Sequence, residues 1–495
     1  MGHPTAASLS PMDYIMPRFY ANCIFTLRLK NGVPFEKVHD VLQQSLRKTC
    51  DELPVIGHWV YPASNSREGV PGMIETRNPG NSRLEVVCND LSTKLPSYEE
   101  FVLEGLKQED LDAETLLPRG ATHWSLGESG LPILLTQANF LEGGLLLGIG
   151  IFHSVIDGAS FMLMMKVWAS YAHSMQEGHN APNLGPQLNL HPDSCNYEIP
   201  EKLWSAAGGQ KVSTADVGAL PADVWRAAGL HHPRVTNNEI SNNDEDVEMR
   251  TAILYIPGAS LDALRSDASG PAAGAHGTTL TPITANDALM ALMWRCQMRA
   301  RATAASAVKD PAYNQDQQTL LDTTFNGRRL FSDDLPWSYM GSMVFLCTAA
   351  MTVGGLISPT TSLADIARAV RDSMESLSQK RLHGAFSLAS ALPDYVPGKS
   401  LRYPYATFQG TEVMITSMLA ISAYEMSFGS ALFGNAGRPD YVRPPRREFD
   451  AICRRCIVLP MQVSRGCEVM IEMKAEEMEL LLADDELRKY CKVVD

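Results

Sequence analysis

The chain has 495 residues, a formal net charge of −14 and a pI of about 5.4. This charge argues against nucleic acid as a partner, because phosphate-backbone binding needs Lys and Arg clustered on a basic surface. Hydrophobic residues make up 45% of the chain, yet no run approaches the roughly 18 apolar residues of a membrane span. The length predicts at least two domains, and the 10 Cys without framework spacing predict free thiols in a reducing, cytoplasmic setting.

The first half of the chain alternates strand and helix signals. Residues 23–29 read as a strand, and apolar positions at helical spacing follow over 38–49. The segment 64–80 is rich in Ser, Asn, Gly and Pro and predicts a loop or hairpin. Residues 84–87 and 133–140 predict two further strands.

The stretch that organises this half is LLLGIGIFHSVIDGA. Residues 145–152 are apolar or Gly without interruption, which is typical of a strand buried on both faces. The strand ends at His153, Asp157 and Gly158 signal a turn, and helical periodicity resumes over 159–171. The pattern therefore places the imidazole of His153 in a turn directly after a buried strand. A side chain with a pKa of about 6.5 can act as a general base there.

The second half restarts after a loop-rich, acidic segment. The tract 237–246 is rich in Asn, Asp and Glu, and such a composition predicts an exposed crossover between two domains. Strands are predicted at 251–256 and 451–459, and helices after residues 260, 284 and 362. We therefore predict an N-terminal domain over 1–195, a crossover linker over 196–250 and a C-terminal domain over 251–495.

The spacing of His153 and Asp157 forms an HxxxDG motif, and the chain resembles the BAHD acyltransferases, relatives of chloramphenicol acetyltransferase and of peptide-synthetase condensation domains. An LSxxD-type opening, a Thr-Ser-Met segment at 416–418 and a GRPDYVRP tail at 437–444 also match family elements. The likeness is greatest to the fungal branch that includes trichothecene acetyltransferases. It implies an α/β fold of two chloramphenicol acetyltransferase-like domains, each a mixed sheet with flanking helices, with the active-site tunnel between them.

The resemblance also implies roles for individual residues. His153 would be the general base and Asp157 a structural residue, held ionised by Arg328, which occupies the place of the family's D-x-R arginine. Ser417 would donate a hydrogen bond to the oxyanion or to coenzyme A. Arg438 and Arg443 lie in an arginine-rich tract that also holds residues 446, 447, 454 and 455; they would contact coenzyme A phosphates or form a solvated basic loop.

The family's DFGWG element is degenerate in this chain. Ser427 stands in place of its Asp and Ala431 in place of its Trp, which bears on stability more than on chemistry. His231 and His232 have no Cys or carboxylate at ligand spacing, so we expect no metal.

The expected activity is acyl transfer from a coenzyme A thioester, acetyl-CoA or longer, to a hydroxyl or amine of a secondary metabolite, without a covalent intermediate. The expected partners are the acyl-CoA and a small-molecule acceptor, and the expected state is a cytoplasmic monomer. Two alternatives remain open: a condensation-type enzyme that uses a carrier-protein thioester, and a non-acylating protein that binds or cyclises a metabolite on the same fold.

Overall fold

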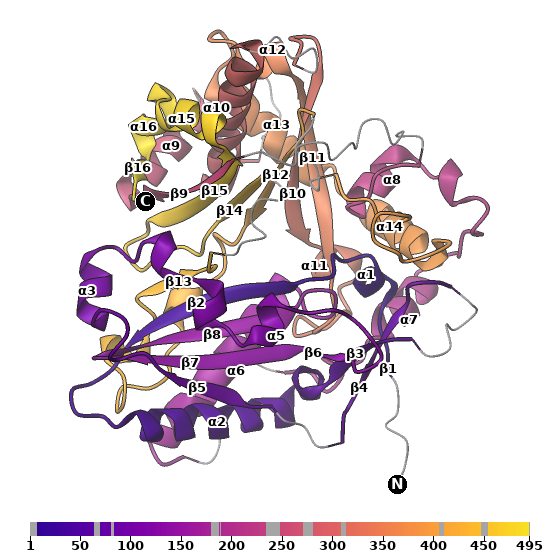
Figure 1. Ribbon diagram of the computed structural model, residues 1–495. Coiled ribbons are helices and arrows are strands. Elements are labelled where there is room, and N and C mark those ends of the chain that lie inside the picture. The colour runs from indigo at the N-terminus through magenta and orange to yellow at the C-terminus, as the bar shows by residue number, and fades with distance from the viewer. Residues whose placement is uncertain are drawn as a thin grey trace.

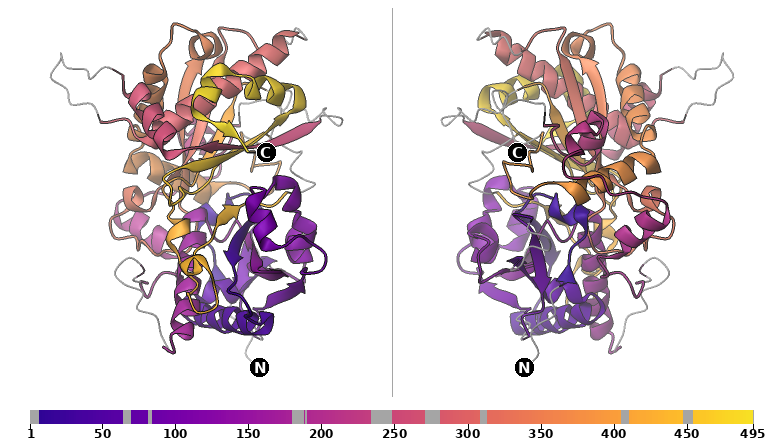
Figure 2. Two further views of the ribbon diagram at one scale, coloured as in Figure 1. Left: turned by 90° about the vertical axis from the view of Figure 1, so that its left-hand side faces the viewer. Right: turned by 90° about the vertical axis from the view of Figure 1, so that its right-hand side faces the viewer.

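The computed structural model describes residues 7–63, 70–80, 84–179, 188, 190–233, 248–270, 281–307, 313–404, 410–446 and 454–494. Within these ranges the chain forms two α/β halves, one above the other in Figure 1 and again in the side views of Figure 2. No helix among these residues is both long and apolar enough to cross a bilayer.

The lower half is built around a sheet in the order β13-β2-β8-β7-β5. Its central strand is β8 (Gly144–Phe152), buried at every position, which confirms the predicted two-sided burial. The other strands are β13 (Tyr441–Arg443), β2 (Tyr20–Arg28), β7 (Leu134–Leu141) and β5 (Val86–Asp90). β8 pairs antiparallel with both β2 and β7, so the strand that ends before His153 is fixed in register on both edges.

Helices cover both faces of this sheet. Two long helices, α2 (Phe35–Glu52) and α6 (Gly158–Gln176), pack together against it; in Figure 1 α2 runs below the strands and α6 passes behind them. Short helices cover the other face: α3 (Tyr98–Leu103), α4 (Ala113–Leu116) and α5 (Arg119–Thr122). A Cβ at Gly148 or Gly144 would lie 2.2 Å from the Leu116 carbonyl oxygen or 2.0 Å from the Tyr98 ring. The glycines of β8 therefore allow this layer to approach the strand closely.

A small sheet closes one end of this half. Its order is β1-β4-β3-β6, with β1 (Ala7–Ser8), β4 (Ile74–Arg77), β3 (Trp59–Pro62) and β6 (Leu131–Pro132). β3 and β4 pair antiparallel, so the segment predicted as a loop or hairpin contributes a hairpin strand.

The upper half contains the largest sheet and a second core. The strand order is β11-β10-β12-β14-β15-β9-β16. The strands are β11 (Val344–Thr352), β10 (Gln318–Asn326), β12 (Val413–Ser417), β14 (Arg455–Val458), β15 (Cys467–Lys474), β9 (Met249–Ile256) and β16 (Lys492–Val493). The helices are α9 (Gly258–Ser269), α10 (Ala285–Ala307), α12 (Val353–Ile357), α13 (Leu363–Glu375), α15 (Ala475–Leu482) and α16 (Asp485–Tyr490). Except in its last turn, α10 is buried nearly all round and packs against α9, α13 and α15.

The structure departs from the predicted linker over 196–250. Two helices form there, α7 (Ile199–Ala206) and α8 (Ala222–Ala227). Each buries one Trp, Trp204 and Trp225, in the first core, and Trp204 lies 5.3 Å from Phe386 of α14 (Gln379–Ala391), centroid to centroid. These apolar anchors make the crossover a packed layer; its acidic tract at 237–246 lies outside the described residues.

The predicted boundary at residue 251 also differs from the observed cores. Residues 331–345, 377–401 and 423–442 belong largely to the core of the lower half, and β13 pairs antiparallel with β2. The chain therefore returns to the first half after building most of the second. Sequence order cannot show this, because it requires knowing which strand is the open edge of the lower sheet.

The degenerate DFGWG-like element lies on this return segment, against α6. Phe428 packs on Trp168 with 6.1 Å between ring centroids. The Ser427 hydroxyl donates to the Ala436 carbonyl at 2.6 Å and accepts from the Gly429 N–H at 3.2 Å. A hydroxyl thus closes this turn at the position where the family has a carboxylate.

Candidate active site

The HxxxDG motif spans the junction between β8 and α6. His153 follows the last residue of β8, and its backbone N–H donates to the Phe19 carbonyl at 2.9 Å. Asp157 is the N-cap of α6 and accepts from the Ser160 N–H at 2.9 Å. The predicted order of strand, turn and helix is confirmed, because an N-cap carboxylate satisfies a helix N–H that has no intrahelical partner.

Asp157 and Arg328 form a buried ion pair across the two halves. Each side chain is 1% exposed, and Arg328 Nη1 lies 2.9 Å from Asp157 Oδ2, while Nη2 donates to Oδ1 at 3.0 Å. The Met343 N–H donates to Oδ2 at 3.1 Å, and Ser160 already occupies Oδ1. Oδ1 therefore accepts two hydrogen bonds, and Oδ2 accepts one and lies against the guanidinium, which makes Asp157 a poor acceptor for a proton from an imidazole.

The charge state of Asp157 follows from these contacts. Burial by itself would raise the pKa of the carboxyl, but the adjacent Arg328 guanidinium and the two backbone N–H donors outweigh burial and hold the pKa below its ordinary value. Arg328 also donates to Asn326 Oδ1 at 3.0 Å and to the Gly341 carbonyl at 2.8 Å. Asp157 is thus an ionised structural residue whose contacts with Arg328 join the HxxxDG turn to the loop after β10.

The imidazole of His153 lies in a largely apolar setting. Burial lowers its pKa, while the negative charge of Asp157 and a hydrogen bond to its own backbone raise it to a lesser extent. Nδ1 is buried, and none of the described residues lies within hydrogen-bond distance of it in suitable geometry. The lowered pKa keeps the imidazole neutral at neutral pH, with one ring nitrogen unprotonated, which is the form a general base requires.

Asp13 is a component of this region that the sequence did not identify as functional. Its carboxylate is fully buried and accepts from the Ser342 N–H at 2.6 Å and from the Ser10 N–H at 2.8 Å. Burial raises the pKa of Asp13 well above its ordinary value, and the nearby charge of Asp157 raises it further. The signal available in the sequence was the SPMD capping box, which predicts a helix start but not a contact with residue 342.

Ser417 ends β12, on the same edge of the upper sheet as the carboxyl end of β10. The two strands are parallel, and β10 leads directly to Arg328, so Ser417 lies on the side that faces the HxxxDG turn. Its Oγ donates to Asn286 Oδ1 at 2.6 Å and accepts from the Leu419 N–H at 3.3 Å. Asn286, at the start of α10, was not recognised in the sequence because its partner is 131 positions away.

The two arginines expected to contact coenzyme A differ in their environment. Arg438 is exposed, whereas Arg443 is 1% exposed and pairs with Glu468 through Nη2 at 2.7 Å and Nε at 2.8 Å. Its Nη1 donates to the Gly105 carbonyl at 3.0 Å and to that of Leu106. All three guanidinium nitrogens of Arg443 are therefore already bound inside the protein, which argues against a contact with coenzyme A.

The rest of the arginine-rich tract also contains both exposed arginines and arginines that pair with carboxylates. Arg446 is exposed, whereas Arg454 pairs with Glu477 at 2.5 Å and Arg455 pairs with Glu472. Residue 447 lies outside the described residues. Among the described members of the tract, Arg438 and Arg446 are the exposed ones.

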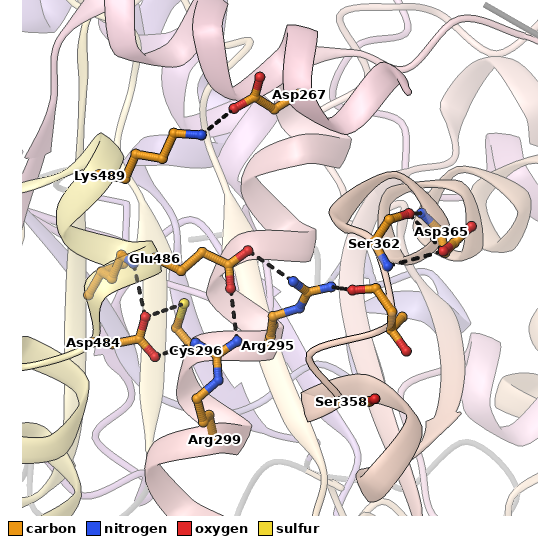
Figure 3. Close-up of polar contacts among 12 residues, drawn as sticks. Asp267, Arg295, Cys296, Arg299, Ser358, Ser362, Asp365, Asp484, Glu486 and Lys489 are labelled. Carbon is orange, nitrogen blue, oxygen red and sulfur yellow. Dashed lines mark hydrogen bonds and ion pairs between the residues drawn. The ribbon is translucent and has the colours of Figure 1, made fainter. Parts of the chain in front are cut away.

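A second polar cluster joins α10 to the segment around α16 in the upper half (Figure 3). The ligand atoms of Cys296, Asp484 and Glu486 lie within 4.8 Å of one another, which is a spacing compatible with a metal ion. However, Arg299 donates to Asp484 at 2.5 Å and to Glu486 at 2.8 Å, and Arg295 donates to Glu486 at 2.9 Å. Two guanidinium groups already neutralise these carboxylates, so the cluster is an ion-pair network that attaches the last helix.

Comparison with known proteins places the chain among acyl-transferring relatives. The model of the Transferase family matches residues 5–487. The chain is 25% identical to the isocyanide synthase-NRPS hybrid crmA of Aspergillus fumigatus, where the alignment covers 99% of this chain and 31% of the relative. It is 24% identical to acyltransferase BOA11 of Botryotinia fuckeliana, covering 94% of this chain and 92% of the relative. It thus spans about a third of one relative and nearly the whole of the other.

A solved structure matches over the same extent. The crystal structure of F. graminearum TRI101, complexed with coenzyme A and T-2 mycotoxin, superposes with a TM-score of 0.76. The match covers 99% of this chain and 100% of that protein at 16% identity. At that level of identity the likeness establishes the fold, and the function must be argued from the residues of the site.

Proposed function

This chain belongs to the Transferase family, whose members resemble the BAHD acyltransferases, and on that premise we propose that it transfers an acyl group from a coenzyme A thioester to a hydroxyl or amine of a small secondary metabolite. The observation that carries the proposal is the set of contacts around the HxxxDG turn. A largely neutral imidazole at His153 adjoins a carboxylate at Asp157 that cannot accept its proton. This arrangement suits a base that acts alone.

In the proposed reaction His153 Nε2 takes the proton from the acceptor as its oxygen or nitrogen attacks the thioester carbonyl. The carbon–sulfur bond then breaks, and the imidazolium returns the proton to the departing thiolate, so that a free thiol and the acylated product leave. No acyl group is attached to the protein. The Asp157 charge stabilises the transient imidazolium without itself becoming protonated, because Arg328 and the two backbone N–H donors hold the pKa of its carboxyl low.

The developing oxyanion requires a donor, for which Ser417 is the candidate. In the structure the single hydroxyl proton of Ser417 points to Asn286 Oδ1. Ser417 can serve the oxyanion only if this hydroxyl rotates, or if the Asn286 amide turns so that its Nδ2 donates to Ser417 Oγ. The role of Ser417 is therefore coupled to that of Asn286.

The relatives support the class of substrate. BOA11 is named an acyltransferase, and the TRI101 structure holds coenzyme A together with a mycotoxin. Another relative, from Penicillium roqueforti, is an eremophilane O-acetyltransferase, 23% identical and aligned over 97% of both chains. The names and ligands of these fungal enzymes support acetyl-CoA or a longer thioester as the donor of this chain, and a hydroxylated secondary metabolite as its acceptor.

The carrier-bound donor is the second candidate, and the observation that favours it is the match to part of an NRPS hybrid. A mass-spectrometric acceptor screen with acetyl-CoA, longer acyl-CoA and the same acyl groups on a carrier protein separates the two. We expect product from acyl-CoA, and His153→Ala should lower turnover by about 10²- to 10⁴-fold with an unchanged unfolding midpoint. Product from carrier-bound thioesters alone would replace the proposal with the condensation reaction, and full activity of folded His153→Ala would reject the mechanism.

A further inference from the structure

The segment that precedes β2 is bound to the HxxxDG turn by hydrogen bonds from two consecutive residues of that turn. The carbonyl of Phe19 accepts from the His153 N–H at 2.9 Å. The Ser154 hydroxyl lies 3.3 Å from the Met16 carbonyl and 3.2 Å from that of Pro17. Because Ser154 is fully buried, these contacts fix the position of the segment relative to the imidazole.

The same segment is also fixed from its other side. Arg18 donates to the carbonyls of Tyr395 at 2.9 Å and of Gly72, and the Tyr403 hydroxyl donates to the Ile15 carbonyl at 3.1 Å. These partners lie 54 to 388 positions away from the segment in sequence. The backbone that carries Phe19 is therefore held by several separate parts of the fold.

The Phe19 side chain lies on the catalytic side of this segment. Its ring centroid is 5.1 Å from that of His153, with 35° between the ring planes, and the residue is 37% exposed. Phe19 is thus a large apolar ring that is rigidly held, in contact with the proposed base and still open to a ligand. The contact leaves one part of the ring against the imidazole and another part facing outward.

We propose that Phe19 forms an aromatic wall of the acceptor site and selects acceptors whose reactive hydroxyl or amine is carried on an apolar ring. This inference rests on the proposed function, because it places the acceptor beside His153. An apolar ring that packs on Phe19 excludes water from both surfaces and brings its hydroxyl within reach of the imidazole. A densely hydroxylated acceptor would have to give up hydration against the same ring without gaining hydrogen bonds.

The test measures binding of 1-naphthylmethanol, a single hydroxyl on an apolar ring system, in the absence of any acyl donor. The protein is labelled with ¹³C-histidine, and the His153 ring resonance is assigned from its loss in His153→Ala. We expect the probe to shift that resonance, with binding weakened about 3- to 10-fold in Phe19→Ala and Phe19→Leu. Phe19→Tyr should restore binding, because it retains the ring. The matched control is Trp337→Ala, which removes another exposed aromatic side chain, 56% exposed, and should leave binding unchanged.

Absence of a His153 shift in the wild type would overturn the inference, as would equal binding by wild type and Phe19→Leu. If Phe19→Ala unfolds, Phe19→Leu, which keeps an apolar side chain of similar volume, decides the result. A protein that binds the probe through Phe19 but consumes no thioester in the acceptor screen would refute the proposed function and leave the aromatic wall standing. If the protein transfers acyl groups but its Phe19 variants bind the probe as tightly as the wild type, the aromatic wall is refuted and the proposed function stands.

Discussion

Breaking the pair of Asp157 and Arg328 should cost a large fraction of the stability of the protein. Arg328→Met leaves a carboxylate that is 1% exposed with only the N–H groups of Ser160 and Met343 as donors. Removing one partner of a buried pair costs about 3 to 5 kcal/mol, because the other charge stays desolvated. Asp157→Asn should cost about 3 kcal/mol, since Arg328 keeps its carbonyl and amide acceptors but loses its counter-charge.

The double variant tests whether these costs share one origin. Because the second substitution removes the charge that the first left unpaired, we expect the double loss to fall below the sum of the single losses by about 1 to 3 kcal/mol. Free energies of unfolding from urea titrations measure this coupling. The matched control is the exposed pair of Glu198 and Lys202, 3.0 Å apart with side chains 61% and 65% exposed, whose coupling should stay below about 0.5 kcal/mol. Additivity at Asp157 and Arg328 within about 0.5 kcal/mol would refute the reasoning.

Three further results are expected. The acid limb of kcat/KM should have its midpoint below 6.5, because burial lowers the pKa of His153 and activity is lost as pH falls through that pKa; a midpoint above 6.5 would contradict the assignment. Burial raises the pKa of Asp322 to about 6, against the opposing effect of Arg226, so its contribution to stability is present at low pH and lost as pH rises through 6. As pH rises from 4.5 to 8, the free energy of unfolding of Asp322→Asn should therefore increase by about 2 kcal/mol relative to that of the wild type, as measured by urea unfolding. A difference between the two proteins that stays constant with pH would count against this. No described carboxylate pairs with the exposed Arg438, so its guanidinium can bind a phosphate of the donor. Arg438→Gln should therefore raise the KM for acyl-CoA several-fold and weaken the salt dependence of that KM, with kcat nearly unchanged. An unchanged KM would show that Arg438 does not bind the donor.

Much of the architecture around the site could be predicted from local pattern. The uninterrupted apolar run at 145–152 and the Asp-Gly turn predicted β8 to within one residue and the start of α6, whereas the predicted helical periodicity over 159–171 ended before α6 does at Gln176. The proximity of Asp157 and Arg328, 171 positions apart, came only from resemblance to a family. Neither residue carries a local signal for this contact, since a local pattern predicts secondary structure and not which loops meet.

Other features could not be predicted because they depend on distant packing. Arg443 was expected at the surface from its arginine-rich neighbourhood, but its burial follows from the pairing of β13 with β2, which brings it to Glu468 and the carbonyls of Gly105 and Leu106. Strands β10 and β11 were not predicted: Thr, Asn and Asp interrupt the first, and small residues dilute the second. Tertiary pairing along nine residues of each strand compensates for these weak propensities.

The pairing of β13 with β2 has a consequence for dividing the protein. A fragment that ended before residue 248 would lack β13, so backbone N–H and C=O groups of β2 would lie unpaired along an apolar edge. Such an edge is a template for intermolecular strand addition, and we expect that fragment to aggregate when it is produced alone. Co-production with the remainder of the chain would supply β13 in trans and cap the edge. The two halves are therefore a single folding unit closed by an exchanged strand, and a split version should regain solubility only as a complex of its fragments.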